Sequence, residues 1–226
     1  IVSVVIDTTA PAAPTLQLDA VSDTGTTGDN RTNDTTPTLS GNGVAGDTIT
    51  ITLPTGTLTT TVAANGTWTA TPSTPLATGT QSITARATDA AGNSSGNASL
   101  SLTIDTTAPA APAVSLAAAS DSGTLGDNLT NDSTPTLSGT GVAGDTIHVT
   151  LPSGTVLQAT VAANGTWSVT PATALANGTN ALTVTATDAA GNVSAATVLT
   201  GPKTSCLFMA SETLGSFANK RVGGTK

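Results

Sequence analysis

Residues 146–151 read Thr-Ile-His-Val-Thr-Leu, and Pro-Ser-Gly follows them at once. Apolar and polar side chains alternate in this run, which is the pattern of a strand with one buried face. The Pro-Ser-Gly turn leads to a second alternating run at residues 155–161, so the two runs predict a hairpin. Asn164-Gly165, the strongest short hairpin signal in the chain, then introduces a strand at residues 166–170. The stretch therefore predicts antiparallel β-structure.

Further short runs on both sides bring the set to seven strands, each bounded by turn residues. The remaining four are residues 113–119, 134–139, 181–187 and 194–200. Seven short strands within about a hundred residues predict an immunoglobulin-like β-sandwich. Trp167 is the one large aromatic side chain of this set, and we expect it to fill the core rather than to form a ligand platform. Small β-branched residues and one Trp make a modest core, so we expect marginal stability without a further staple.

The module is present twice. The octet Asp-Thr-Thr-Ala-Pro-Ala-Ala-Pro at residues 7–14 returns unchanged at residues 105–112. Residues 33–56 also match residues 131–154 at 19 of 24 positions, and Trp68 repeats as Trp167. A chain that copies one module is built as an array.

We therefore predict an all-β chain of tandem seven-stranded immunoglobulin-like β-sandwiches. Module 1 spans residues 7–104 and module 2 spans residues 105–200. Residues 1–6 match the end of module 1, so we interpret them as the last strand of a preceding module in a longer protein. Residues 201–226 form an atypical tail, which we expect to be poorly ordered.

Charge and cysteine usage exclude several classes of protein. Before Gly201 there are thirteen Asp, no Glu and two basic residues, which gives a charge of 2 − 13 = −11. Nucleic-acid binding is disfavoured because the modules carry no basic patch. Cys206 is the only Cys, so neither a disulfide framework nor a zinc set can form. No apolar run is long enough to span a bilayer, and we expect no membrane insertion by this segment.

Strand parity predicts where the acidic residues gather. In a seven-stranded antiparallel module the loop after the first strand (the AB loop, residues 22–34 and 120–132) lies at the C-terminal end. The loop between the last two strands (the FG loop, residues 89–93 and 188–192) lies at the N-terminal end. The AB loop of module 1 and the FG loop of module 2 should thus both lie beside Asp105.

Several carboxylates at one place repel one another unless a cation binds them, and Ca²⁺ takes six to eight oxygen ligands of this kind. At the junction between the modules the predicted Ca²⁺ ligands are Asp105, Asp188, Asn192, one or two of Asp23, Asp29 and Asp34, and the backbone carbonyl of Thr107. The matching half-site at the N-terminal end is Asp7, Asp89 and Asn93, and at the C-terminal end it is Asp121, Asp127 and Asp132. A plain turn role stays open for these residues, because Asx side chains cap tight turns. For Asp47 and Asp145, which stand apart from the cluster in sequence, the turn role is the preferred interpretation.

Each module carries four motifs in order: Asp-Thr-Thr-Ala-Pro, the AB loop, Asn-Gly-Thr-Trp and Thr-Asp-Ala-Ala-Gly-Asn. The AB loop of module 2 reads Asp-Ser-Gly-Thr-Leu-Gly-Asp-Asn-Leu-Thr-Asn-Asp (residues 121–132), and module 1 differs from it at three positions. Together the four motifs resemble bacterial Ig-like repeats of giant type I-secreted surface adhesins, including biofilm-associated proteins. The resemblance implies Ca²⁺ at the module junctions and an extended rod that holds an adhesive tip away from the cell. After Thr200 the chain departs from the repeat pattern, so no linker Asp follows the AB loop of module 2.

The resemblance leads to one expected function and one alternative. The chain is expected to be a Ca²⁺-stiffened extender segment of a large bacterial cell-surface adhesin, which supports adhesion and biofilm formation outside the cell. Its expected partners are the neighbouring Ig-like modules of the same chain. Alternatively, an Ig-like module itself recognises a glycan or protein ligand through its loops. An enzyme is not expected, because His148 is the only His, and no catalytic set can be built around it.

Overall fold

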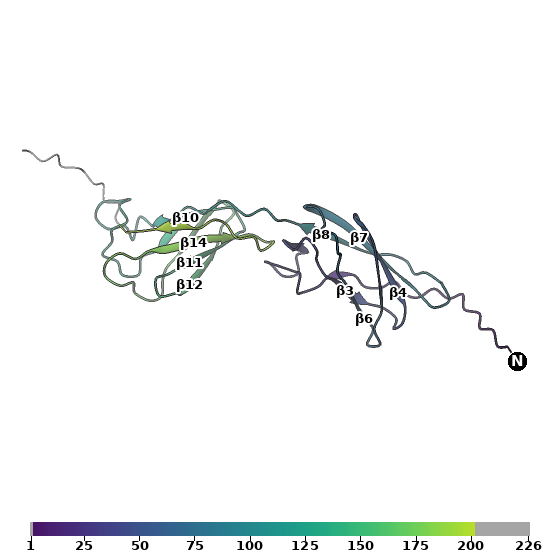
Figure 1. Cartoon of the computed structure of the whole chain (residues 1–226). Coiled ribbons are helices and arrows are strands. Elements are labelled where there is room, and N and C mark those ends of the chain that lie inside the picture. Colours follow the sequence, from purple (N-terminus) through teal and green to yellow (C-terminus); the bar gives the residue numbers. More distant parts are fainter. Residues whose placement is uncertain (1, 202–226) are drawn as a thin grey trace, which may run out of the picture.

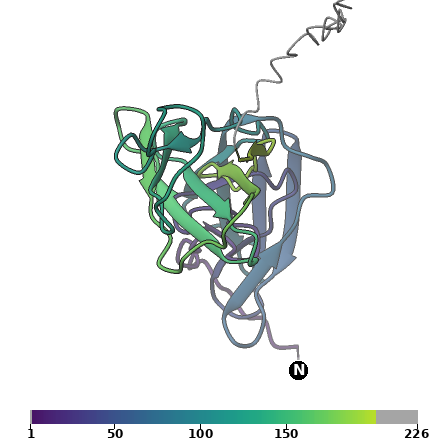
Figure 2. The ribbon, with the colours of Figure 1, turned by 90° about the vertical axis from the view of Figure 1, so that its left-hand side faces the viewer.

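The computed structural model describes residues 2–201 and consists of two β-sandwiches placed end to end (Figure 1). Residue 1 and residues 202–226 of the predicted tail lie outside the described residues. Figure 2 looks along the long axis, with the second module in front of the first. Within residues 2–201 every regular element is a strand, and no helix there is long and apolar enough to cross a membrane.

Module 1 packs a three-stranded sheet against a five-stranded sheet. Its strands are β1 (Gln17–Leu18), β2 (Arg31–Thr32), β3 (Leu39–Asn42), β4 (Thr48–Leu53), β5 (Gly56–Thr61), β6 (Thr67–Ala70), β7 (Gly79–Thr88) and β8 (Ala98–Ile104). The sheet orders are β1-β3-β6 and β2-β8-β7-β4-β5. The short β2 pairs parallel to the end of β8, with Arg31 opposite Thr103, and the sequence did not predict this strand.

Module 2 has all seven predicted strands in sheets of three and four. They are β9 (Ser115–Leu116), β10 (Leu137–Thr140), β11 (Thr146–Thr150), β12 (Val156–Thr160), β13 (Thr166–Val169), β14 (Leu182–Thr187) and β15 (Thr197–Leu199). The sheet orders are β13-β10-β9 and β12-β11-β14-β15. The last strand begins later than predicted. Ser194 contacts Ala186 through its backbone N–H and its hydroxyl, which accepts the Ala186 N–H, and the regular strand starts only at Thr197. The immunoglobulin-like sandwich is therefore confirmed.

Each module has its own core. In β4 the side chains of Ile49, Ile51 and Leu53 are buried and alternate with more exposed Thr residues. Trp68 and Trp167 are buried within the two clusters, so their predicted role as core fillers is confirmed. A side chain on the glycine opposite each Trp would collide with that ring and with a backbone carbonyl. Each indole ring therefore packs against the glycine opposite it, and this packing depends on the absence of a Cβ there.

Candidate functional site

The junction between the modules brings together the three segments that strand parity predicts. Asp105 follows β8 directly. Its backbone N–H donates to the Thr32 carbonyl in module 1 at 2.9 Å. On the other side, the Asn192 side-chain amide of module 2 donates to the Asp105 carbonyl at 2.8 Å. Asp105 is therefore held by the AB loop side of one module and by the FG loop of the next.

The two loops also contact each other directly. The Thr24 hydroxyl donates to the Ala190 carbonyl at 2.6 Å, and the Thr26 N–H donates to the Ala189 carbonyl at 2.9 Å. Gly25 and Gly191 lie against one another in left-handed conformations, with φ of 73° and 90°. A Cβ on Gly25 would meet the Ala189 carbonyl and lie 2.5 Å from the Gly191 nitrogen. The two backbones therefore approach as closely as they do because both positions are glycine.

The FG loop of module 2 is a self-contained carboxylate–amide turn. The Asp188 carboxylate accepts the Asn192 backbone N–H and the Asn192 side-chain amide, both at 2.9 Å. The same Asn192 amide reaches the Asp105 carbonyl, so it links the turn to the linker. In module 1 the equivalent Asn93 amide donates to the Asp89 carboxylate and lowers its pKa. These hydrogen bonds satisfy part of each carboxylate and leave its remaining lone pairs available to a cation.

The acids in the AB loop of module 1 differ in the hydrogen bonds that their carboxylate oxygens accept from the loop itself. Asp34 accepts the Ser22 hydroxyl on one oxygen and the Thr36 N–H on the other. Asp29 accepts the Arg31 N–H at 2.8 Å. Asp23 accepts the Gly28 N–H with one oxygen, while its other oxygen is buried and has no hydrogen-bond partner among the described residues. Asp23 is thus the AB loop acid with an unused buried oxygen, and Asp34 acts first as a turn cap.

The linker carboxylate has two partners of its own. One Asp105 oxygen accepts the Thr107 N–H at 3.0 Å, so Thr107 closes a turn around the linker acid. The other lies 3.4 Å from the Arg31 guanidinium. Both side chains of this pair are partly exposed, which makes the ion pair weak. Arg31 is the local counter-charge of Asp105 and would compete with a bound cation.

Asp145 is a junction acid that the sequence analysis assigned to a plain turn. Its backbone does form that turn, because its N–H donates to the Val142 carbonyl at 3.1 Å. Its side chain is only 6% exposed, however, and one carboxylate oxygen has no hydrogen-bond partner in the described part of the chain. Burial raises the pKa of the Asp145 carboxyl, and the negative charge of Asp188 raises it further.

The position of Asp145 follows from register. Thr146 pairs with Thr187, so Asp145 and Asp188 stand just beyond paired residues at the same edge of the sheet. The parity argument could have found it, because the turn before the third strand lies at the N-terminal end of the module. The predicted turn role of Asp145 is present in the backbone, and its place near Asp188 is a further feature that distance in sequence did not indicate.

The outer half-sites repeat the junction chemistry in part. At the N-terminal end, the Asn93 amide donates to the Asp7 carbonyl at 3.2 Å, as Asn192 does to Asp105. At the C-terminal end, Asp121 is buried and has one oxygen without a partner in the described structure. Asp127 accepts the Leu129 N–H. The Thr134 N–H and the Ser120 hydroxyl lower the pKa of Asp132, so this acid caps its loop as Asp34 does.

The donor chemistry of the junction fits a hard cation. Within residues 2–201 no three His, Cys, Asp or Glu side chains gather around one point. An ion would therefore draw on single carboxylates, amide and backbone carbonyls and water, which is the mixed oxygen set that Ca²⁺ accepts. Buried carboxylate oxygens without a partner, on Asp23 and Asp145, are costly groups that a cation would satisfy.

Comparison with known proteins assigns both modules to one domain family. The family model described as "Bacterial Ig-like domain" matches residues 9–106 and 107–200. Comparison with curated proteins gives no match.

Among solved structures, the chain is similar to a 1.5-MDa bacterial ice-binding adhesin, with 27% identity over 84% of this chain and 64% of that one, and a TM-score of 0.39. A second similar structure is a Ca²⁺-stabilized adhesin that helps an Antarctic bacterium reach out and bind ice. It is 28% identical over 87% of this chain and 49% of that one, with a TM-score of 0.40. The chain thus spans about half to two thirds of these proteins, and the TM-scores are too low to carry an argument about its function.

Proposed function

We propose, since the chain belongs to the bacterial Ig-like domain family, that it is a Ca²⁺-stiffened extender segment of a large bacterial cell-surface adhesin. In this role the modules carry no adhesive site of their own and set the distance between the cell and the adhesive part of the protein. The observation that carries the proposal is the junction, where a linker acid and loops from two modules meet around buried, unsatisfied carboxylate oxygens.

The junction residues divide into ligands and supports. Asp105, Asp188, Asp23 and Asp145 are the candidate carboxylates at the junction. Ca²⁺ would draw on them singly, together with amide and backbone carbonyls and water, and would offset their negative charge. Asn192 and Thr107 hold these acids in place through the hydrogen bonds described above. Asp29 and Asp34 keep the AB loop folded. A cation bound by groups from both modules resists bending, because any rotation at the linker would break its coordination.

The working environment of such a segment is extracellular. Sites built on few carboxylates and neutral carbonyls bind Ca²⁺ with a Kd of roughly 10⁻⁴ to 10⁻³ M. Such a junction stays loose at cytosolic Ca²⁺ levels and becomes rigid after export. Adhesion and biofilm formation are the processes that a rigid surface rod of this kind serves.

Calorimetric titration of the chain with CaCl₂ tests the proposal. We expect binding that raises the melting temperature, and affinity at least about tenfold lower in Asp105→Asn and Asp188→Asn, since each removes one ligand charge. Asp19→Asn is the control, because Asp19 belongs to none of the predicted Ca²⁺ sites and its carboxylate accepts the Val21 N–H in an exposed turn. If the wild-type chain gives neither binding heat nor a change in melting temperature, the calcium junction does not exist.

A further inference from the structure

The five-stranded sheet of module 1 has one protected edge and one open edge. At the protected edge lies β2, which is two residues long and begins at the charged Arg31. At the other edge lies β5, which pairs with β4 over six residues without a break in register. Among the described residues no strand pairs with the other side of β5, and β6 belongs to the second sheet. An edge strand of this kind offers unpaired backbone N–H and C=O groups to another strand.

The register shows which backbone groups of β5 are open. Val62, the residue after β5, directs both of its backbone groups toward the turn before β4. Its N–H donates to the Asp47 carbonyl at 2.9 Å, and its carbonyl accepts the Gly46 N–H at 3.0 Å. Backbone groups alternate between the two sides of an antiparallel strand. Every second residue before Val62 therefore directs its N–H and C=O groups to the open side, namely Thr57, Thr59 and Thr61.

The open edge is neutral in an otherwise strongly acidic chain. Residues 48–85, which include β4, β5 and β6, contain no charged residue, although the two modules carry a charge of −11. The acids lie in the loops and the linker at the module ends. Proteins commonly protect an edge strand with a charge, a proline or a bulge, and β5 has none of these. Two copies of the chain therefore repel one another at the module ends and not at this edge.

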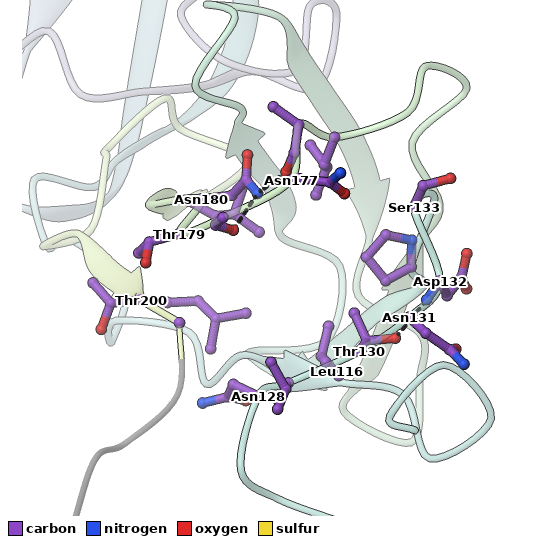
Figure 3. A pocket seen from close by; sticks show the side chains of 18 residues that line it. Leu116, Asn128, Thr130, Asn131, Asp132, Ser133, Asn177, Thr179, Asn180 and Thr200 are labelled. Carbon is purple, nitrogen blue, oxygen red and sulfur yellow. Dashed lines mark hydrogen bonds between the residues drawn. The ribbon is translucent and has the colours of Figure 1, made fainter. Parts of the chain in front are cut away.

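The long sheet edges of module 2 are less suited to a partner strand. The equivalent of β5 is β12, which has five residues, and its exposed side chains differ from one another: Val156, Gln158 and Thr160. At the other edge of that sheet, β15 lies beside a cavity of about 350 Å³, whose walls include Thr130 and Thr179 (Figure 3). This cavity borders Gly201, the last described residue, so nothing about a partner follows from the β15 edge.

We propose that β5 pairs antiparallel with β5 of a second copy of this chain. With Thr59 opposite the Thr59 of the other copy, Thr57 lies opposite Thr61, and the open backbone groups of each strand face those of the other. The contact has twofold symmetry and closes on itself, because both copies use the same strand. The two five-stranded sheets become one continuous sheet by strand addition, in which backbone hydrogen bonds give the affinity.

The side chains fit the same register. On the outer face of the sheet, Thr61 pairs with Thr48, and Thr57 pairs with Thr52. The joint would place Thr57 of one copy beside Thr61 of the other, so each row of threonines continues from one sheet into the next. Cross-strand threonine pairs stabilise a sheet. The exposed side chains of β5 are all threonine and stand at alternate positions, which makes this strand complementary to itself.

Sedimentation velocity of the full chain at rising concentration, in a chelator, tests the proposal. We expect dimers in the wild-type chain, and more of them as NaCl screens the repulsion between the acidic ends. Thr59→Lys should abolish them, because two like charges then face each other at the centre of the joint. Thr52→Lys is the matched control, since it adds the same charge to the same face one strand further in, and it should still dimerise. Dimers without Ca²⁺ separate this proposal from the calcium junction.

An equimolar mixture of the Thr59→Lys and Thr59→Glu chains tests the register itself. Each variant alone should be monomeric. The mixture should dimerise again, because opposite charges then lie at the centre of the joint. A mixture that stays monomeric while the wild-type chain dimerises would contradict the placing of Thr59 opposite itself.

Disulfide trapping detects the contact even where it is short-lived. In a Cys206→Ser background, Thr59→Cys puts one thiol from each copy at the centre of the joint. The Cα atoms of such a pair lie about 5.5 Å apart, which suits a disulfide. We expect this variant to form oxidised dimers faster than Thr52→Cys in the same background. Equal trapping in both, a dimer that survives Thr59→Lys, or one lost in Gln158→Lys instead would overturn the proposal.

Discussion

Gly25→Ala is the substitution that probes the junction most directly, because the chain provides its own matched control. Gly25 and its counterpart in module 2, Gly123, have nearly the same left-handed backbone, with φ of 73° and 81°. Alanine in that conformation costs about 1–2 kcal/mol at either position. At Gly123 the new Cβ meets nothing within 4 Å, whereas at Gly25 it meets the backbone of Ala189 and Gly191.

The difference between the two variants measures the junction. The new methyl group faces backbone atoms rather than a movable side chain, so the AB and FG loops must separate. Separation breaks the Thr26–Ala189 and Thr24–Ala190 hydrogen bonds, each of which contributes about 1 kcal/mol. We therefore expect Gly25→Ala to lower the free energy of unfolding by about 2 kcal/mol more than Gly123→Ala does.

Urea unfolding followed by tryptophan fluorescence is a suitable assay, since each module contains one buried Trp. Small-angle scattering of the same variants reports whether the two modules still hold a fixed orientation. We expect a broader range of shapes for Gly25→Ala and a wild-type profile for Gly123→Ala. Equal unfolding free energies and identical scattering profiles for the two variants would refute the contact between the loops.

Three further predictions concern the charged groups. Asp145→Asn should raise the melting temperature in a chelator, because it removes a buried charge beside Asp188, and should lower the further increase that Ca²⁺ produces; a lower melting temperature in the chelator would contradict the burial argument. Arg31→Leu copies Leu129 of module 2 and should strengthen Ca²⁺ binding in a calorimetric titration, because the guanidinium no longer competes for Asp105. In the chelator it should change the free energy of unfolding by less than about 1 kcal/mol. Weaker Ca²⁺ binding would show that Arg31 supports the site. The lowered pKa values of Asp89 and Asp132 mean that their contribution to stability is present above the ordinary carboxyl pKa of about 4 and is lost as the pH falls through the lowered values. Urea unfolding from neutral to acid pH should show this loss, and Asp132→Asn should make it smaller; an unchanged pH dependence in Asp132→Asn would contradict the assignment.

The sequence predicts the sandwich well because its strands are encoded locally. The alternation in β11 and the Asn164-Gly165 turn specify which face is buried and where the chain reverses. The convergence at Asp105 was also predictable, since strand parity alone decides at which end of a module each loop lies. Because the modules follow one another in tandem, the C-terminal end of module 1 meets the N-terminal end of module 2. The AB loop of module 1 and the FG loop of module 2 therefore lie at one junction.

Two features were missed for physical reasons. The pairing of β2 with β8 joins two residues inside a polar loop to the end of the last strand, and neither apolar alternation nor a turn signal marks it. Asp145 was assigned by its distance from other acids along the chain, although sheet register places it beside Asp188. The ligand assignments at Asp105, Asp188 and the AB loop stay predictions, and folding adds the buried, unpartnered oxygens of Asp23 and Asp145 to them.

The most direct test of the central claim is small-angle scattering of the chain in millimolar Ca²⁺ and again after chelation. The calcium-stiffened junction predicts one elongated, rigid particle in Ca²⁺. After chelation it predicts a wider distribution of maximum dimensions and a lower melting temperature. Superimposable scattering profiles and equal melting temperatures in the two conditions would contradict the claim that Ca²⁺ stiffens this chain.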